Sequence, residues 1–149
     1  MTAATQTIQY STFYVGDLLF GIDVMQVQEV IRYQSMTSVP LAPSVVRGLI
    51  NLRGQIVTAI DLRKRMNMRP LGEEHLPLNI VVRTSEGVVS LLVDQIGDVL
   101  AVDESSREEP PRTLPEEQKN LIEAVYTLDR QLLLVLNVER AVYAAGDAV

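Results

Sequence analysis

The sequence contains no cysteine, which excludes a disulfide framework, a thiolate zinc site and a cysteine nucleophile. It has one histidine, His75, whose polar neighbours GEEHLP predict a solvated loop residue rather than a general base or metal ligand. No basic residue precedes Arg32, so we expect no secretory signal. The longest aliphatic run at a strand-like position, 132–136, is far shorter than the ~18 residues that span a bilayer. These absences favour a soluble, cytoplasmic protein without direct membrane insertion.

The chain also lacks the short motifs by which many enzymes are recognised. It has no GxSxG elbow, GxGxxG or Walker loop, HExxH pair or EF-hand spacing, so we expect no catalysis, metal or cofactor. Thirteen Lys and Arg against nineteen Asp and Glu give a formal net charge of -6, which disfavours nucleic acid and anionic membranes as partners. A small β-barrel enzyme or small-molecule binder remains an alternative, and it would have a deep pocket with converging ionisable groups.

The 149 residues, 47% of them apolar, suffice for one globular domain with its own core. Aromatic and β-branched segments separated by Gly, Asp and Pro predict a mainly β fold. The expected strands are 8–15, 18–23, 26–32, 48–52, 55–60, 78–84, 88–94, 95–102, 124–128 and 131–138. A polar, acidic loop covers about 103–116, where Thr113-x-x-Glu116 predicts a capping box for a short helix that ends near Leu121.

The two halves of the chain repeat one pattern. When the sequence is shifted against itself, LINLRGQIVTAIDLRKR (49–65) lies over VYTLDRQLLLVLNVERA (125–141), and Asp61 falls on Asn137 as a second helix N-cap. The shift predicts an internal duplication in which each half supplies about five strands and a short helix. Five short strands usually close into a small barrel, and halves of this size must pack on each other to be stable. The expected division is 1–7 as a flexible N-terminus, 8–145 as the domain and 146–149 as a tail.

Arg53 lies at a predicted hairpin turn between Asn51 and Gly54. It is either an ordinary charged turn residue or an exposed guanidinium held on a rigid hairpin to pair with a carboxylate. Glu29 is either that carboxylate or a partner contact of its own. A basic cluster around this turn forms either the solvated face of a short helix or a patch for an acidic protein surface. Its members are Arg47, Arg53, Arg63, Lys64, Arg65 and Arg69.

Four segments in order resemble a known family. GIDVMQVQEV (21–30), VPLAPSVVRGLINLRGQIV (39–57), AIDLR (59–63) and VSLLVDQIGDVL (89–100) are similar to CheW-type chemotaxis coupling proteins. The resemblance covers about residues 10–143, and its most specific part is the NLRG and DLR pair after an xVxEV strand. One departure is Thr58-Ala59, where the family often has Pro-Val before DLR.

The resemblance implies two intertwined five-stranded SH3-like β-barrel subdomains with a shared apolar core and short helices. It also implies a non-catalytic adaptor that couples the cytoplasmic tips of methyl-accepting chemoreceptors to the regulatory domain of a CheA-type histidine kinase. Such a protein is cytoplasmic and associates with membrane receptor arrays through its partners. The alternative is a coupling protein of the same fold in a chemosensory pathway that controls pili, gliding or another output. The implied partner-binding residues are Val27, Glu29, Asn51, Arg53, Val88, Val93, Asp94 and Val99.

Overall fold

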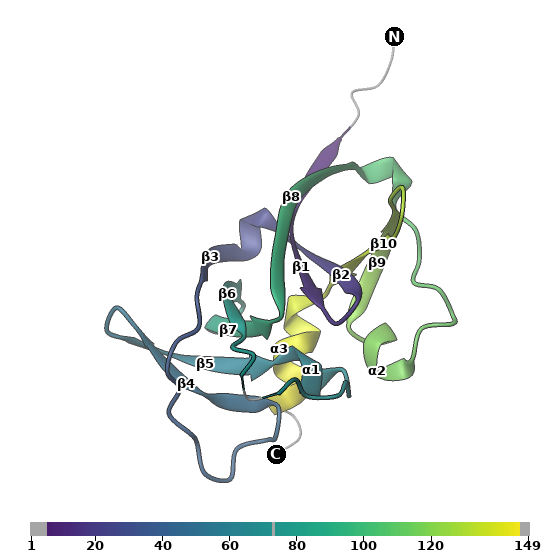
Figure 1. The fold of residues 1–149 in the computed structure, drawn as a ribbon. Coiled ribbons are helices and arrows are strands. Elements are labelled where there is room, and N and C mark those ends of the chain that lie inside the picture. Colours follow the sequence, from purple (N-terminus) through teal and green to yellow (C-terminus); the bar gives the residue numbers. More distant parts are fainter. Residues whose placement is uncertain (1–5, 73, 147–149) are drawn as a thin grey trace.

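The structure, a computed structural model, describes residues 6–72 and 74–146. Its strands form two five-stranded sheets, in agreement with the mainly β prediction (Figure 1). Sheet A has the order β8-β1-β2-β10-β9, with β1 (Thr7–Val15), β2 (Leu18–Asp23), β8 (Gln95–Asp103), β9 (Ile122–Thr127) and β10 (Leu132–Leu136). Sheet B has the order β3-β6-β7-β5-β4, with β3 (Val27–Ile31), β4 (Val46–Leu52), β5 (Gln55–Asp61), β6 (Leu78–Thr84) and β7 (Gly87–Val93).

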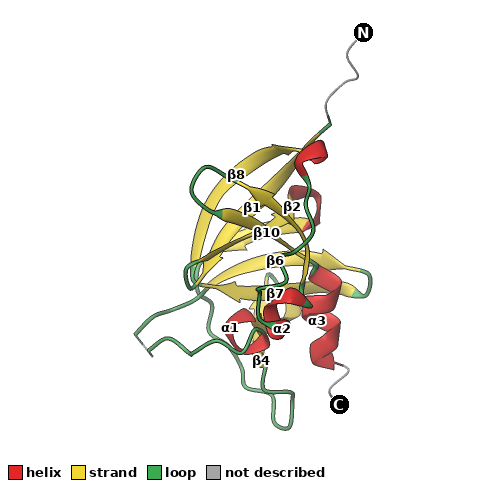
Figure 2. Cartoon of the chain, turned by 90° about the vertical axis from the view of Figure 1, so that its right-hand side faces the viewer, coloured by secondary structure: helices red, strands yellow, loops and turns green. Residues whose placement is uncertain are grey.

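The helices are short and connect or follow these strands (Figure 2). They are η1 (Val24–Gln26), α1 (Leu62–Arg65), η2 (Glu104–Ser106), α2 (Glu116–Lys119) and α3 (Val138–Gly146). Asp61 and Asn137 precede α1 and α3, and their side chains accept hydrogen bonds from the backbone N–H groups of Lys64 and Arg140. The two predicted N-caps are therefore confirmed.

One local prediction was wrong. The predicted capping box at Thr113 does not form, because α2 has Pro115 as its N-cap, makes no side-chain cap bond and ends at Lys119. The residue before a proline is disfavoured in the α region, so Leu114 does not start the helix and α2 begins at Glu116. At the N-terminus of the described chain, β1 begins at Thr7, and the Gln6 carbonyl accepts a hydrogen bond from the Glu104 N–H. Residues 1–5 and 147–149 lie outside the described residues.

The two sheets have equivalent topologies, as the predicted duplication requires. Strands β6, β7, β3, β4 and β5 occupy in sheet B the places that β1, β2, β8, β9 and β10 occupy in sheet A. Each sheet contains one parallel pair, β5 with β7 and β10 with β2. Each half of the chain thus supplies its first two strands to one sheet and its last three to the other. The halves are intertwined rather than placed side by side.

Each sheet is closed by one isolated bridge at an equivalent position. After β3, Thr37 exchanges two backbone hydrogen bonds of 2.8 Å with Leu49 of β4. After β8, Glu108 exchanges two of 2.9 Å with Val125 of β9, the residue on which Leu49 falls in the predicted duplication. The chain beyond one edge strand of each sheet therefore pairs with the opposite edge strand. This closes each sheet into a small barrel and covers part of an edge that would otherwise be unpaired.

Three hydrophobic clusters fill the molecule. Two lie within one sheet each: Tyr10, Leu19, Ala124, Tyr126, Leu133 and Val135 in sheet A, and Ile50, Leu52, Val57 and Val81 in sheet B. The third and largest, the shared core, joins both sheets and α3, and includes Phe13, Phe20, Ile80, Leu91 and Val138. Alternate residues of β10 face the sheet A cluster and the shared core. Both faces of β10 are thus buried, one inside its own barrel and the other against the shared core.

Candidate functional site

The edge strands β3 and β8 differ from the other strands that the structure describes, because neither contains a buried residue. They occupy equivalent places in their sheets, and the chain passes from one sheet to the other immediately before each of them. Exposed apolar side chains accompany them: Val30 on β3, Val99 on β8 and Met25 in η1 are 41%, 57% and 78% exposed. We call the exposed side chains of β3 and β8, with Met25 and the Arg53 turn, the β3–β8 face.

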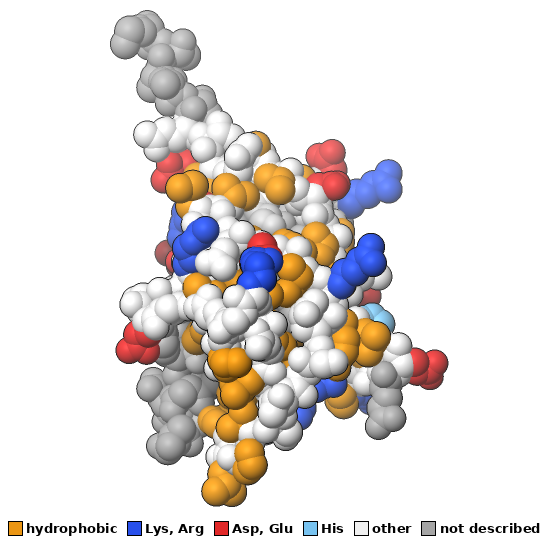
Figure 3. Space-filling model, turned by 90° about the vertical axis from the view of Figure 1, so that its left-hand side faces the viewer, with side chains coloured by type: hydrophobic (Ala, Val, Ile, Leu, Met, Phe, Trp, Pro, Cys, Tyr) orange, Lys and Arg blue, Asp and Glu red, His pale blue; other side chains and the backbone are white. Residues whose placement is uncertain are grey.

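Figure 3 views the molecule from the side of β3, and hydrophobic side chains lie there among charged ones. Val30 and Val99 on this face come from edge strands, and Met25 comes from η1. Ile56 of β5, which follows the Arg53 turn in the chain, is also 61% exposed. Met25 and Val30 were not among the predicted site residues, since an exposed apolar residue resembles a core residue in the sequence alone.

The charged part of this face is an ion pair between Glu29 of β3 and Arg53 at the β4–β5 turn. The Arg53 side chain is 71% exposed and that of Glu29 is 21% exposed, so the guanidinium keeps an open side toward solvent. Of the two alternatives left open for Glu29, the structure shows the one in which its carboxylate pairs with Arg53. Asn51 supports the turn, because its side-chain oxygen accepts a hydrogen bond of 2.9 Å from the Gly54 N–H.

The Arg53 backbone adopts an uncommon conformation. Arg53 and Gly54 have φ angles of +52° and +89°, which matches a two-residue hairpin turn with positive φ at both central positions. Glycine, asparagine or aspartate is usual at the first of these positions, and other residues are strained there. Backbone strain of this kind is concentrated at functional sites, although Leu41 and Asn67 also have positive φ angles in this structure.

The other predicted site residues lie in different environments. Val27 and Val88 are half-buried and pack against the shared core and the sheet B cluster, respectively. Val93 is 1% exposed within the shared core, so its side chain is not available to a partner in this fold. Val99 lies on the β3–β8 face. The structure thus brings together Glu29, Asn51 and Arg53, with Val99 on the companion edge strand.

Asp94, the remaining predicted site residue, forms the least exposed ion pair. Its carboxylate accepts hydrogen bonds from Arg63 Nη2 at 2.7 Å, Arg63 Nε at 3.0 Å and the Gly16 N–H at 2.6 Å. The side chains of Arg63 and Asp94 are 16% and 13% exposed. The basic cluster is therefore not simply a solvated helix face, because Arg53, Arg63 and Arg47 pair with Glu29, Asp94 and Asp61.

We expect the Asp94 contacts to make stability depend on pH. Burial raises the pKa of the Asp94 carboxyl. The hydrogen bonds from Arg63 and Gly16 and the positive charge of Arg63 lower the pKa by more than burial raises it, so the pKa lies below its usual value. The stabilisation is therefore complete above the unfolded pKa of about 3.9 and is lost as pH falls through the folded pKa. Asp94→Asn should lower the free energy of unfolding by about 2 kcal/mol at pH 7.

Urea denaturation of both proteins from pH 7 to pH 3 measures this effect. The difference between them should stay constant down to about pH 5 and shrink below about pH 4. Asp98→Asn, which changes an exposed carboxylate on β8, is the matched control and should behave as wild type. A difference that persists unchanged to pH 3 would contradict the role given to the Asp94 charge.

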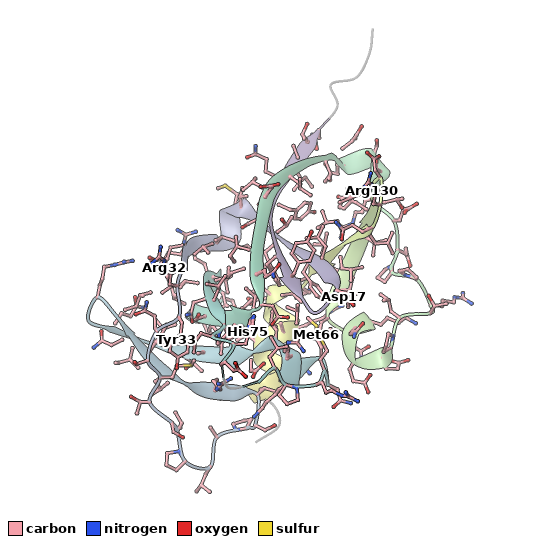
Figure 4. All side chains as sticks on the ribbon, viewed as in Figure 1. Asp17, Arg32, Tyr33, Met66, His75 and Arg130 are labelled. Carbon is pink, nitrogen blue, oxygen red and sulfur yellow. The ribbon has the colours of Figure 1, made fainter. Side chains whose placement is uncertain are left out.

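A cavity of about 530 Å³ lies beside this ion pair and is the place where an enzyme or small-molecule site would be sought. Its lining includes Arg47, Asp61, Arg63, His75 and Asp94. Both carboxylates are held by arginines in ion pairs, so neither is presented as a free acid or base. His75 is exposed in the connection between α1 and β6, as its polar neighbours predicted (Figure 4). Within residues 6–72 and 74–146, no group of three potential metal-ligating side chains was found.

Comparison with known proteins agrees with the fold. The family model described as a CheW-like domain matches residues 9–145. The chain belongs to the CheW-like family. Among CheW-like relatives, the chemotaxis protein CheW of Treponema pallidum is 29% identical over 144 residues, covering 94% of this chain and 85% of that protein. The chemotaxis protein CheW of Bacillus subtilis is 30% identical over 138 residues, covering 92% and 88%.

A solved CheW structure is also similar to this CheW-like chain. It is the scaffolding protein TtCheW from Thermoanaerobacter tengcongensis, with a TM-score of 0.82 and 28% sequence identity, covering 91% of this chain and 92% of that one. The fold expected from the CheW resemblance is therefore confirmed. In the described part of this CheW-like chain, no helix is long and apolar enough to cross a membrane.

Proposed function

We propose that this protein is a non-catalytic adaptor in bacterial chemotaxis, which couples the cytoplasmic tips of transmembrane chemoreceptors to a CheA-type histidine kinase. The observation that carries the proposal is the β3–β8 face, where two edge strands present exposed apolar side chains and β3 also carries the Glu29–Arg53 pair. Membership of the CheW-like family supports the chemotaxis role. The names of the relatives favour this pathway over one that controls pili or gliding.

The chemistry of the face suits a helical partner. The cytoplasmic tip of a chemoreceptor is a helical hairpin. An amphipathic helix binds by placing its apolar residues against an apolar surface. Val30, Val99 and Met25 supply that surface, and Arg53 supplies an exposed donor for a carboxylate. Modest contacts of this kind become effective when many copies are held together, because a high local concentration replaces a tight single site. We therefore expect a cytoplasmic protein recruited to receptor arrays by its partners.

Calorimetric titration with the regulatory domain of a CheA-type kinase, and separately with a soluble receptor tip, tests the function. We expect saturable binding to both, with receptor binding weakened about fivefold or more by Val30→Glu or Val99→Glu, because a charge replaces apolar contact area. Glu117→Ala changes an exposed residue of α2, away from β3 in Figure 1, and should bind as wild type. Folded protein that binds neither partner would contradict the adaptor function.

A further inference from the structure

Two equivalent contacts connect the barrels on the helical side of the molecule. In the first, Arg63 of α1, which continues β5 of sheet B, binds Asp94, and Asp94 binds the Gly16 N–H in the β1–β2 turn of sheet A. In the second, Glu139 of α3, which continues β10 of sheet A, accepts a hydrogen bond from the Ser85 N–H in the β6–β7 turn of sheet B. Each helix thus holds a hairpin turn of the opposite barrel.

The equivalence follows from the duplication. Arg63 falls on Glu139 in the same shift that lays Asp61 on Asn137, and the β1–β2 and β6–β7 hairpins occupy the same place in their sheets. We call these contacts the Arg63 clamp (Arg63, Asp94, Gly16) and the Glu139 clamp (Glu139, Ser85). Their chemistry differs. The first is a multiply hydrogen-bonded ion pair with little exposure, whereas in the second, more exposed contact a backbone N–H faces two carboxylate oxygens at 3.2 and 3.4 Å.

The Arg63 clamp lies at a point where the chain passes from one barrel to the other. In the described part of the chain, the backbone passes between the sheets twice, through η1 before β3 and at Asp94 before β8. Asp94 also donates its backbone N–H to the Tyr14 carbonyl at 3.0 Å, so both its backbone and its side chain are fixed to sheet A. Strand β3 belongs to sheet B and β8 to sheet A. A rotation of one barrel relative to the other therefore changes the distance or the angle between these two strands.

We propose that Arg63 and Glu139 are positioning residues, which set the angle between the barrels and thereby the spacing of β3 and β8 for a partner. Neither residue belongs to the β3–β8 face. The bidentate guanidinium contact of Arg63 supplies direction as well as charge, and lysine cannot reproduce it. The Arg63 clamp is therefore the main determinant and the Glu139 clamp a weaker one. The link to partner binding rests on the proposed function, whereas the link to barrel orientation does not.

The absence of cysteine allows this to be measured directly. Cysteines introduced at the exposed positions Gln28 on β3 and Ala101 on β8 can carry spin labels, and pulsed electron spin resonance then reports the distance between the barrels. We expect one narrow distance distribution in the doubly labelled protein that keeps Arg63. Arg63→Met should broaden or shift this distribution, and Arg63→Lys should give an intermediate result. Lys64→Met on the same helix is the matched control and should leave the distribution unchanged.

Binding is measured on the same variants without labels. Arg63→Met should weaken partner binding about fivefold. Glu139→Gln should weaken it about twofold, and this variant tests the proposal if Arg63→Met folds poorly. An unchanged distance distribution in both clamp variants would overturn the proposal, as would a changed distribution with unaltered binding. If the unsubstituted protein binds no kinase or receptor, the proposed function fails, and the distances alone then decide whether the clamps set the barrel orientation.

Discussion

Arg53→Glu should lower partner affinity about tenfold or more while changing the free energy of unfolding by less than about 1 kcal/mol. The two effects differ because the Arg53 side chain is largely exposed and adds little to stability through its pair with Glu29. The guanidinium has five donors, and the side turned to solvent remains free for a partner carboxylate. Calorimetric titration gives the affinity, and chemical denaturation gives the stability.

Arg53→Gly sharpens this test. Glycine adopts a φ of +52° without strain, so this variant should be at least as stable as wild type and still lose most of the binding. The double variant Glu29→Arg with Arg53→Glu keeps an opposite-charge pair between β3 and the hairpin, but the exposed member of the pair is now a carboxylate. We expect this double variant to bind the partner as weakly as Arg53→Glu does. Restored binding in the double variant would mean that the pair only fixes the hairpin and that Arg53 does not contact the partner.

Gly48→Val should lower the free energy of unfolding by about 3 kcal/mol, the largest stability effect we expect from a single substitution here. A Cβ at Gly48 would lie 2.7 Å from the Thr37 backbone carbonyl oxygen, closer than non-bonded atoms tolerate. That carbonyl accepts a hydrogen bond from Leu49 in the bridge that closes sheet B, so it cannot move away without breaking the bridge. Urea denaturation followed by far-ultraviolet circular dichroism measures the loss.

Gly72→Ala is the control for this prediction, because a Cβ at Gly72 would have no neighbour within 4 Å. Gly48→Ala should already cost a substantial part of the stability lost in Gly48→Val, since the first carbon makes the clash. At the equivalent position of sheet A the chain has Ala124, so the two closures differ in how closely the bridging segment approaches. Wild-type stability of Gly48→Ala would refute the idea that this close approach closes the barrel.

The sequence by itself determined the local and repeated features of the fold. Alternating and apolar runs predicted the ends of the strands to within about two residues. The spacing of apolar residues and the presence of β-branched residues indicate which faces of a strand are buried. Laying 49–65 over 125–141 predicted the duplication, and the structure repeats it in strand order, parallel pairs and closing bridges. The register irregularity between Val46 and Gly48 falls, in the same shift, on the one between Ile122 and Ala124. Asp61 and Asn137 were predicted as caps because capping involves only neighbouring residues.

Only the tertiary structure decided what each charged or apolar residue does. Glu29 and Arg53 are far apart in the chain, and the sequence left open whether they meet; the pairing of sheet B places them together. Asp94 and Val93 appeared equally suited to a partner, yet the crossing between sheets buries Val93 in the shared core and joins Asp94 to Arg63. Burial and long-range pairing depend on how the halves exchange strands, and a linear pattern contains residue types and spacing but not that exchange.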